Sequence, residues 1–245
     1  MPAKRVLTTD EILATLNHSS LPTLVVEGDE DVIIFRRLEN STPDLSLSVL
    51  PVGGRSQVFA LFERRGEIRG KQEIAFVADQ DLWVLSNVPQ EYISDKLIFT
   101  DGYSIENDAF RDGNYRDLLY GAERTRFAAD LENFSRWFAL AAARNIKDGD
   151  PIDIHANHIL DNEGQRETMM VLKEGETYPQ ELYEKIRTDY LRFVRGKSLF
   201  QLFQRQMRGS RPVKHSKVSL LEMAAARPGQ HIQSLFERAT AALTP

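Results

Sequence analysis

Acidic side chains follow two apolar stretches of strand length. Glu27 ends the run Leu24 to Val26, and Asp79 and Asp81 follow the run Ile74 to Ala78. Buried parallel strands carry such uninterrupted apolar runs, and their carboxyl ends lie at one edge of the sheet. We therefore expect these acids to converge. Carboxylate oxygens are the ligands that Mg²⁺ and Mn²⁺ prefer, so the sequence predicts a divalent-cation site.

The spacing within the second acidic turn supports this interpretation. Asp79 and Asp81 are two residues apart, and in an extended backbone their side chains point to the same side. Their repulsion makes ionising both costly unless a cation is bound. We assign Asp79 and Asp81 to metal ligation, and Glu27 either to ligation or to general-base catalysis. Alternatively, both turns only cap the helices that follow, a role for which Asp29 and Asp81 are suitable.

Further acids are candidates for the same site. Asp31 lies four residues after Glu27, so it can lean back by one helical turn as a second-metal ligand. The alternative for Asp31 is a solvated acid in a first helical turn. Asp101, Glu106 and Asn107 follow the fourth predicted strand and could line the site. We favour Glu106 as a metal ligand, and its alternative role is to cap the next helix.

A glycine-rich turn lies at the same expected sheet edge. It consists of Gly53, Gly54, Arg55 and Ser56. A flexible turn, two backbone N–H groups and a guanidinium at a helix start suit a bound phosphate. The alternative is a simple turn with no ligand.

Basic residues are concentrated in one segment, although the net charge is -5. Residues 185–217 contain ten Lys or Arg and a single acid. This segment could bind a polyanion, with Arg195 and Lys197 on phosphates. Alternatively, it pairs with the acidic remainder of the chain or with a second subunit, as in a homodimer.

The elements that must position these residues alternate between strands and helices, after a short N-terminal helix that starts near Thr8. Such alternation is typical of βαβ units, whose right-handed crossovers place every strand-to-helix turn at one edge of a parallel sheet. We predict an α/β fold: a mostly parallel, Rossmann-like sheet flanked by helices within residues 1–108, then a mainly helical region over 109–245. The expected strands are 23–26, 45–50, 73–78 and 97–100.

The second region has helical patterns over residues 126–146 and 178–208, with Gly196 as the expected break in the latter. The tail predicts two short helices within 219–243, separated near Pro228. Residues 152–154 and 169–172 are either short strands or extended links.

Composition excludes several classes of protein. Hydrophobic content of 42% and charged content of 27% are ordinary for a globular protein. No run approaches the roughly 18 apolar residues of a membrane span. We therefore expect a cytoplasmic protein without membrane contact. The absence of cysteine excludes thiolate metal sites and disulfides, and His155 and His158 lack a third zinc ligand at known spacing.

These motifs together resemble the TOPRIM domain of topoisomerases, primases and related nucleases. The glutamate after the first strand and the Asp-x-Asp after the third match Glu27 and Asp79 to Asp81. Residues 26–32, 51–58, 100–107 and 195–199 are similar to a bacterial TOPRIM family that includes the effector nucleases of PARIS anti-phage defence systems.

This resemblance implies an endonuclease dependent on Mg²⁺ or Mn²⁺ that acts in antiviral defence, cleaves RNA or DNA with tRNA as the favoured substrate, and is controlled by an ATPase. The chain has no Gly-x-x-x-x-Gly-Lys-Ser/Thr motif, so the ATPase must be a separate polypeptide. The alternative is a non-catalytic TOPRIM subunit that docks onto an ATPase.

Overall fold

A four-stranded parallel sheet forms the centre of the protein. The structure is a computed structural model that describes residues 7–70, 72–207 and 215–244. The strand order is β2-β1-β3-β4, and each neighbouring pair is parallel. The predicted α/β class with a parallel sheet flanked by helices is therefore confirmed. The strands are β1 (Thr23–Val26), β2 (Ser48–Pro51), β3 (Ile74–Ala78) and β4 (Leu97–Phe99).

The two central strands explain the uninterrupted apolar runs of the sequence. All four residues of β1 are buried, as are the last four of β3, because helices cover both faces. Strand β2 lies at the edge and is only half-buried. It starts later than the predicted residue 45, because Pro43–Leu45 forms a 3₁₀ helix that ends at Ser46, whose φ is 48°.

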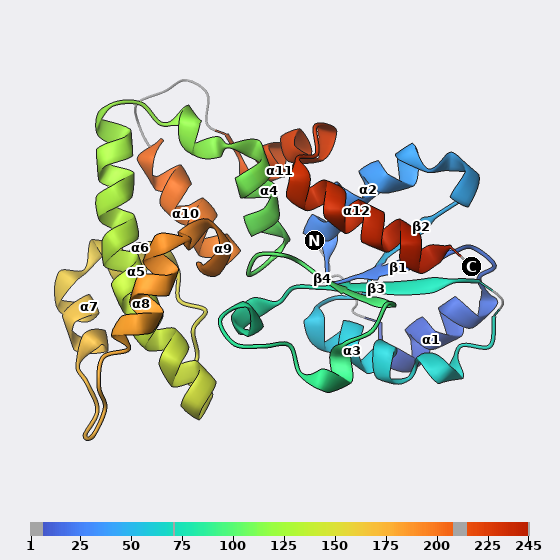
Figure 1. The fold of residues 1–245 in the computed structure, drawn as a ribbon, viewed down its shortest axis with the longest axis horizontal. Helices are drawn as coiled ribbons and strands as arrows, with labels where there is room; N and C mark the ends of the chain where they lie inside the picture. The colour runs from blue at the N-terminus through green and yellow to red at the C-terminus, as the bar shows by residue number, and fades with distance from the viewer. Residues whose placement is uncertain (1–6, 71, 208–214, 245) are drawn as a thin grey trace.

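Different helices cover the two faces of the sheet (Figure 1). Helices α1 (Thr9–His18) and α3 (Arg55–Glu63) cover one face, where Val25 and Phe76 are buried. The opposite face packs against α2 (Asp29–Ser41) and α12 (Gln230–Leu243), and α12 contacts β1, β3 and β4. The last helix of the chain thus covers strands formed by its first hundred residues.

Most other helices lie beside the sheet, next to the carboxyl ends of its strands (Figure 1). Within the described residues, none of the helices has the length and apolar character needed to cross a membrane. The helices other than α1, α2, α3 and α12 are α4 (Ile105–Gly113), α5 (Ala122–Asp148), α6 (Ala156–Asp161), α7 (Glu163–Met170), α8 (Gln180–Thr188), α9 (Tyr190–Phe193), α10 (Gly196–Gln206) and α11 (Lys217–Ala226).

Several expectations about this helical region need correction. Residues 152–154 form no strand, and residues 169–172 comprise the end of α7 and an irregular link. The expected break near Gly196 is present, because α9 ends at Phe193 and α10 begins at Gly196, but the helical pattern is also interrupted at Asp189, after α8. The two predicted tail helices are confirmed as α11 and α12.

One hydrophobic core continues from the sheet into the helical region. Phe110 on α4 packs edge-on against Phe200 and Phe203 of α10, with ring centroids 5.3 and 5.4 Å apart. The same core contains Leu24 of β1 and Phe138 of α5. The predicted domain boundary at residue 108 lies inside α4 and stays a prediction.

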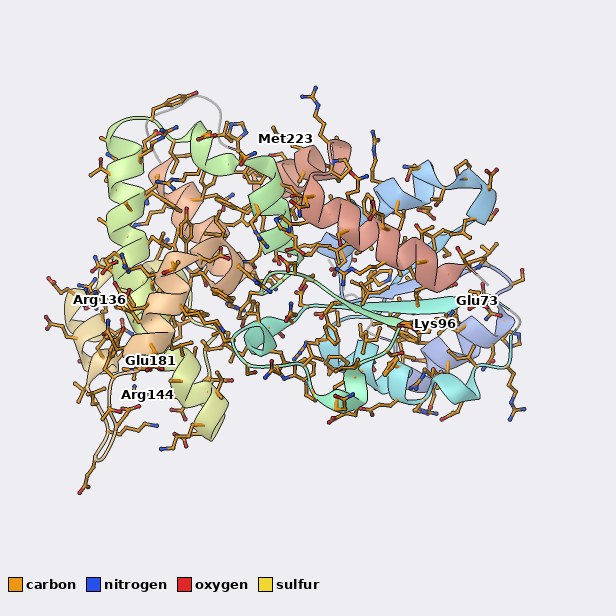
Figure 2. The ribbon with its side chains drawn as sticks, viewed as in Figure 1. Glu73, Lys96, Arg136, Arg144, Glu181 and Met223 are labelled. Atoms are coloured by element: carbon orange, nitrogen blue, oxygen red, sulfur yellow. The ribbon has the colours of Figure 1, made fainter. Side chains whose placement is uncertain are left out.

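The amino ends of the strands are tied to the end of α12. Glu73 and Lys96 lie together at the end of the sheet farthest from α5 to α8 (Figure 2). Lys96 Nζ donates to the Glu73 carboxylate at 2.5 Å and to the Ala242 carbonyl at 2.7 Å. The opposite, carboxyl edge of the sheet faces the helical region and carries the acidic turns.

Candidate functional site

A cavity of about 320 Å³ lies at the carboxyl edge of the sheet. It is enclosed by the turns that follow β1, β2, β3 and β4 and by the start of α10. Seven of the predicted site residues line it. They are Glu27, Asp31, Gly53, Gly54, Asp79, Glu106 and Lys197, whereas Arg55, Ser56, Asp81 and Arg195 do not.

Two acids connect the ends of three strands through backbone hydrogen bonds. The Asp79 backbone N–H after β3 donates to Glu27 Oε1 after β1 at 2.8 Å. The Ile105 N–H at the start of α4 donates to Asp79 Oδ1 at 2.9 Å. Each carboxylate therefore has one oxygen fixed by the backbone, and this orients Glu27 and Asp79 within the cavity.

Asp31 leans back toward the turn that follows β1, as the spacing predicts. Its Oδ2 accepts a hydrogen bond from the Gly28 N–H at 2.8 Å. The residue is only 6% exposed, so the alternative of a solvated first-turn acid does not hold. Asp31 both caps the start of α2 and lines the cavity.

Burial raises the pKa values of these acids. The pKa of Glu27 rises to about 8, because desolvation and the charges of Asp31 and Asp81 outweigh the hydrogen bond from Asp79. Desolvation also raises the pKa of Asp31 to about 7. The pKa of Asp79 lies well above its ordinary value because of desolvation and then the charge of Glu27. A bound cation would relieve this repulsion and favour the ionised forms.

The turn after β3 differs from the expected extended backbone. Gln80 has φ -67° and ψ -31°, and Asp81 has a left-handed φ of 49°. The extended geometry that would place Asp79 and Asp81 on one side is therefore absent. The Asp81 N–H donates to the Tyr103 carbonyl at 2.7 Å, and its carboxylate lies 3.5 Å from Arg55 Nε. Asp81 acts on the cavity acids electrostatically from outside it.

Arg55 holds this turn in place. Its Nε donates to the Asp79 carbonyl at 3.0 Å, and one Nη donates to the Gln80 carbonyl at 3.2 Å. The guanidinium stacks 3.9 Å from the Trp83 ring and 4.8 Å from the Phe59 ring. These contacts position the carboxylates after β3, a role different from the phosphate contact expected from the sequence.

The glycine turn has a backbone that only glycine adopts readily. The φ angles of Gly53 and Gly54 are 93° and 137°. The Gly53 N–H donates to the Glu27 carbonyl at 2.9 Å, so one of the two N–H groups expected to be free is already used. Ser56 is exposed and lies outside the cavity lining.

The segment that follows β4 is joined to the start of α10. Asn107 is fully buried, and its Nδ2 donates to the carbonyls of Leu191 and Val194, each at 2.8 Å. A Cβ atom at Gly196 would come within 2.2 Å of Ser104 Oγ. Asn107 therefore positions neighbouring elements and does not line the cavity.

Basic side chains reach the site from the start of α10. Lys197 is exposed and lines the cavity. Arg195 lies outside it, yet both cations act on Asp81. Burial raises the pKa of Asp81, whereas the charges of Arg55, Arg195 and Lys197 oppose this rise.

Other members of the basic segment pair with acids of the same chain. Arg192 lies 3.5 Å from Asp101, and Arg205 lies 3.1 Å from Asp130. Among the described residues, part of the basic segment therefore forms ion pairs within the chain, which was the alternative to binding a polyanion. Another part, Lys197, lies at the cavity rim. Arg208, Arg211 and Lys214 lie outside the described residues.

Lys217 and Glu30 are site residues that the sequence interpretation missed. Lys217 Nζ forms an ion pair with Glu30 and lies 3.2 Å from Glu106 Oε1. Burial opposes ionisation of Glu106, but Lys217 and Ser104 lower its pKa below the ordinary value. Glu30 directly precedes Asp31 in the first turn of α2, so the pattern that predicts Asp31 as a site residue could also have indicated Glu30. No local pattern brings Lys217 to this place.

A second group of possible metal ligands lies outside the cavity. Ligand atoms of Asp101, Asp108 and His231 lie within 4.8 Å of one another. Asp101 is already paired with Arg111 and Arg192, and Asp108 accepts the N–H groups of Asp101 and Gly102 at 3.0 and 2.9 Å. The charge of Asp101 is therefore compensated by cations of the same chain, whereas burial raises the pKa of Asp108 to about 7 despite its two backbone hydrogen bonds.

The cavity acids lie farther apart than the members of this group. Among the described residues, no three of them have ligand atoms within 4.8 Å of one another, so a cation would have to draw the cavity side chains together. His155 and His158 belong to no such group. Instead, His155 Nδ1 accepts a hydrogen bond from the Asn157 N–H at the start of α6.

Comparison of the chain with protein-family models and with curated proteins finds no match.

Proposed function

We propose that this protein is a TOPRIM-type endonuclease that hydrolyses phosphodiester bonds with the help of Mg²⁺ or Mn²⁺. The observation that carries the proposal is the convergence on one cavity of Glu27 and Asp79, directly after β1 and β3, and of Glu106 at the start of α4, the helix that follows β4. Asp31 adds a fourth carboxylate. Ligands of open α/β sheets bind at this edge, and hard divalent cations bind through such oxygen atoms.

The side chains fit a divalent cation chemically. Glu27, Asp31 and Asp79 are carboxylates whose pKa values are raised by burial and mutual repulsion. Such a group needs either protons or a positive charge to be stable in this position. Glu27, Asp31 and Asp79 would hold the cation. Glu106 borders the same cavity and is paired with Lys217.

A bound cation would polarise a phosphoryl oxygen and lower the pKa of a water molecule. The residues of the chain would orient the reactants around it. Glu27 and Asp79, each held by a backbone N–H, would keep a constant geometry during the reaction. Lys197 at the rim would hold a substrate phosphate. Arg55 would keep the turn after β3 in place and so position Asp79.

A nucleic acid is the proposed substrate, with tRNA favoured over DNA. The cations at the start of α10 support a polyanionic substrate, because Lys197 lines the cavity and the charge of Arg195 also acts on the nearby Asp81. The resemblance to PARIS effector nucleases is the basis for tRNA, for a role in anti-phage defence and for a separate ATPase as partner. A homodimer is compatible with this proposal.

Cleavage assays with purified protein test the proposal. Labelled tRNA and DNA are incubated with Mg²⁺ or Mn²⁺, and the wild type is compared with Glu27→Gln. We expect wild-type cleavage that EDTA abolishes, and a loss of at least about 100-fold in Glu27→Gln, since even indirect partners of metal ligands contribute 10–100-fold. The control is Glu174→Gln, which changes an exposed glutamate on the link between α7 and α8.

Equal cleavage by the wild type and Glu27→Gln would rule out the proposed site. Absence of both cleavage and calorimetric Mg²⁺ binding in the wild type would favour the non-catalytic docking subunit instead. Recovery of an ATPase by a Glu27→Gln bait would then support that second function.

A further inference from the structure

Lys217 places a positive charge directly between two acids of the cavity edge. Its Nζ pairs with the carboxylate of Glu30 on α2 and lies 3.2 Å from Glu106 Oε1 on α4. Side-chain exposure is 21% for Lys217 and 4% for Glu106, so this contact is largely shielded from water. Helix α11, which Lys217 begins, packs against both α2 and α4. The position of the ammonium is therefore fixed by helix packing.

Three other cavity acids, Glu27, Asp31 and Asp79, differ from Glu30 and Glu106 in their ion pairs. Within the part of the chain that the structure describes, no Lys or Arg forms an ion pair with Glu27, Asp31 or Asp79. The acids thus divide into two sets that differ in charge compensation. Glu30 and Glu106 share the single positive charge of Lys217, whereas the set of Glu27, Asp31 and Asp79 is left for an external cation.

We propose that the site takes a single divalent cation, because Lys217 Nζ occupies the place where a second cation would bind. This inference rests on the proposed function and specifies its metal stoichiometry. Two-metal nucleases place their ions roughly 3.5–4 Å apart, and both ions need carboxylate ligands. Here Glu30 and Glu106 are already engaged by a cation. A second divalent ion beside the ammonium would meet a like charge at short range, where repulsion is strong.

The ammonium of Lys217 can also perform the electrostatic role of a second metal ion. A lysine carries a compact point charge with three donors, so it can contact two carboxylates and a substrate oxygen at once. It would stabilise negative charge that develops near Glu106. Such fixed electrostatic stabilisation needs no reorganisation during the reaction.

Counting bound Mn²⁺ ions tests the inference without measuring activity. Equilibrium titration gives the stoichiometry, and electron paramagnetic resonance separates isolated ions from pairs. For the wild type we expect one Mn²⁺ per chain and the spectrum of an isolated ion. Lys217→Gln frees Glu30 and Glu106, so we expect two ions per chain with the spin coupling of ions roughly 3.5–4 Å apart.

Two control variants accompany this test. Lys217→Arg keeps the charge and should keep one ion per chain. Lys147→Gln removes an exposed charge near the end of α5 and should also leave one ion.

Two ions in the wild type would overturn the inference, and so would one ion in a folded Lys217→Gln protein. Both results leave the proposed metal-dependent function intact. If Lys217→Gln does not fold, the wild-type count decides alone: one ion supports the inference and two overturn it. No Mn²⁺ bound to any of these proteins would overturn the inference together with the proposed function.

Discussion

Gly196 and Ser104 lie so close that a Cβ atom at Gly196 would come within 2.2 Å of Ser104 Oγ. This contact joins the start of α10, which carries Lys197, to the turn that carries Glu106. The two segments are far apart in the sequence, and they can approach each other this closely only because Gly196 has no side chain. Substitution at Gly196 therefore probes how rigidly the site is assembled.

We expect Gly196→Ala to lower the unfolding free energy by about 1–3 kcal/mol, the usual cost of overpacking. It should also weaken cleavage, because α10 must move away from α4. Thermal denaturation and the cleavage assay measure the two effects. Gly66→Ala is the matched control, since an added Cβ there meets no atom within 4 Å. Equal melting temperatures for the two variants would contradict the close packing.

We expect Asp79→Asn to be more stable than the wild type in the absence of divalent cations. Asparagine keeps an oxygen to accept the Ile105 N–H and removes a buried charge next to Glu27. Each kcal/mol gained raises the melting temperature by about 2–4 °C in a chain of this size. Calorimetric scans with EDTA test this, and Asp95→Asn at an exposed position is the control. A lower melting temperature for Asp79→Asn would show that its charge is already compensated.

The stability of the cation-free protein should fall as the pH rises from about 5 to 9. The folded-state pKa of Glu27 is about 8 against an ordinary 4.5, and that of Asp31 is about 7 against 3.8. The folded state therefore binds more protons than the unfolded state in this range. The stabilisation is fully present below the ordinary values and is lost as the pH passes through the raised ones. Chemical denaturation at several pH values measures the slope.

Addition of Mg²⁺ should reverse this pH dependence. The cation replaces the protons on Glu27 and Asp31, so binding releases protons and tightens with pH. Calorimetry in two buffers of different ionisation enthalpy detects the release, and NaCl of matched ionic strength is the control. A pH-independent Mg²⁺ affinity between pH 6 and 8 would contradict the raised pKa values.

We expect Arg55→Lys to loosen the turn after β3. Lysine cannot reproduce the paired hydrogen bonds to the carbonyls of Asp79 and Gln80 together with stacking on Trp83. The unfolding free energy should fall by about 1–3 kcal/mol, and Trp83 emission should shift to the red. Arg36→Lys on the exposed surface of α2 is the control. Weaker nucleic-acid binding with unchanged stability and emission would instead favour a phosphate contact.

Lys197→Ala should weaken nucleic-acid binding without changing the melting temperature. Lys197 is exposed at the cavity rim, so its loss removes about one phosphate contact. The slope of log affinity against log salt concentration should fall by about 1. Fluorescence anisotropy with labelled tRNA measures the slope, with Lys147→Ala as the control. An unchanged slope would place Lys197 away from the substrate.

The sheet and part of the site could be predicted because they depend on local patterns. Apolar runs ending in acids locate β1 and β3, and parallel topology then brings Glu27 and Asp79 together. The four-residue spacing likewise predicts how Asp31 leans back. To predict these features, one needs only the typical length of a strand and the period of a helix.

Other features depend on long-range packing that leaves no local trace. The left-handed backbone of Asp81 follows from its bond to Tyr103, and the structural role of Arg55 follows from carbonyls and rings distant in the sequence. Lys217 reaches Glu30 and Glu106 only because α11 packs against both α2 and α4. A count of basic residues identifies its segment but not this contact. Such residues are found from tertiary structure alone.

The position of α12 over the sheet has a consequence during protein synthesis. Strands β1 and β3 leave the ribosome long before α12 does, so the part of the sheet face that α12 covers stays exposed until translation passes residue 243. The contacts that α11 and α12 make with sequence-distant elements form last, and such contacts slow folding. Until they form, apolar surface stays exposed and can be bound by chaperones. Lys217 also arrives in this final step. A translating chain therefore cannot complete the cavity edge before almost the whole described chain has been made.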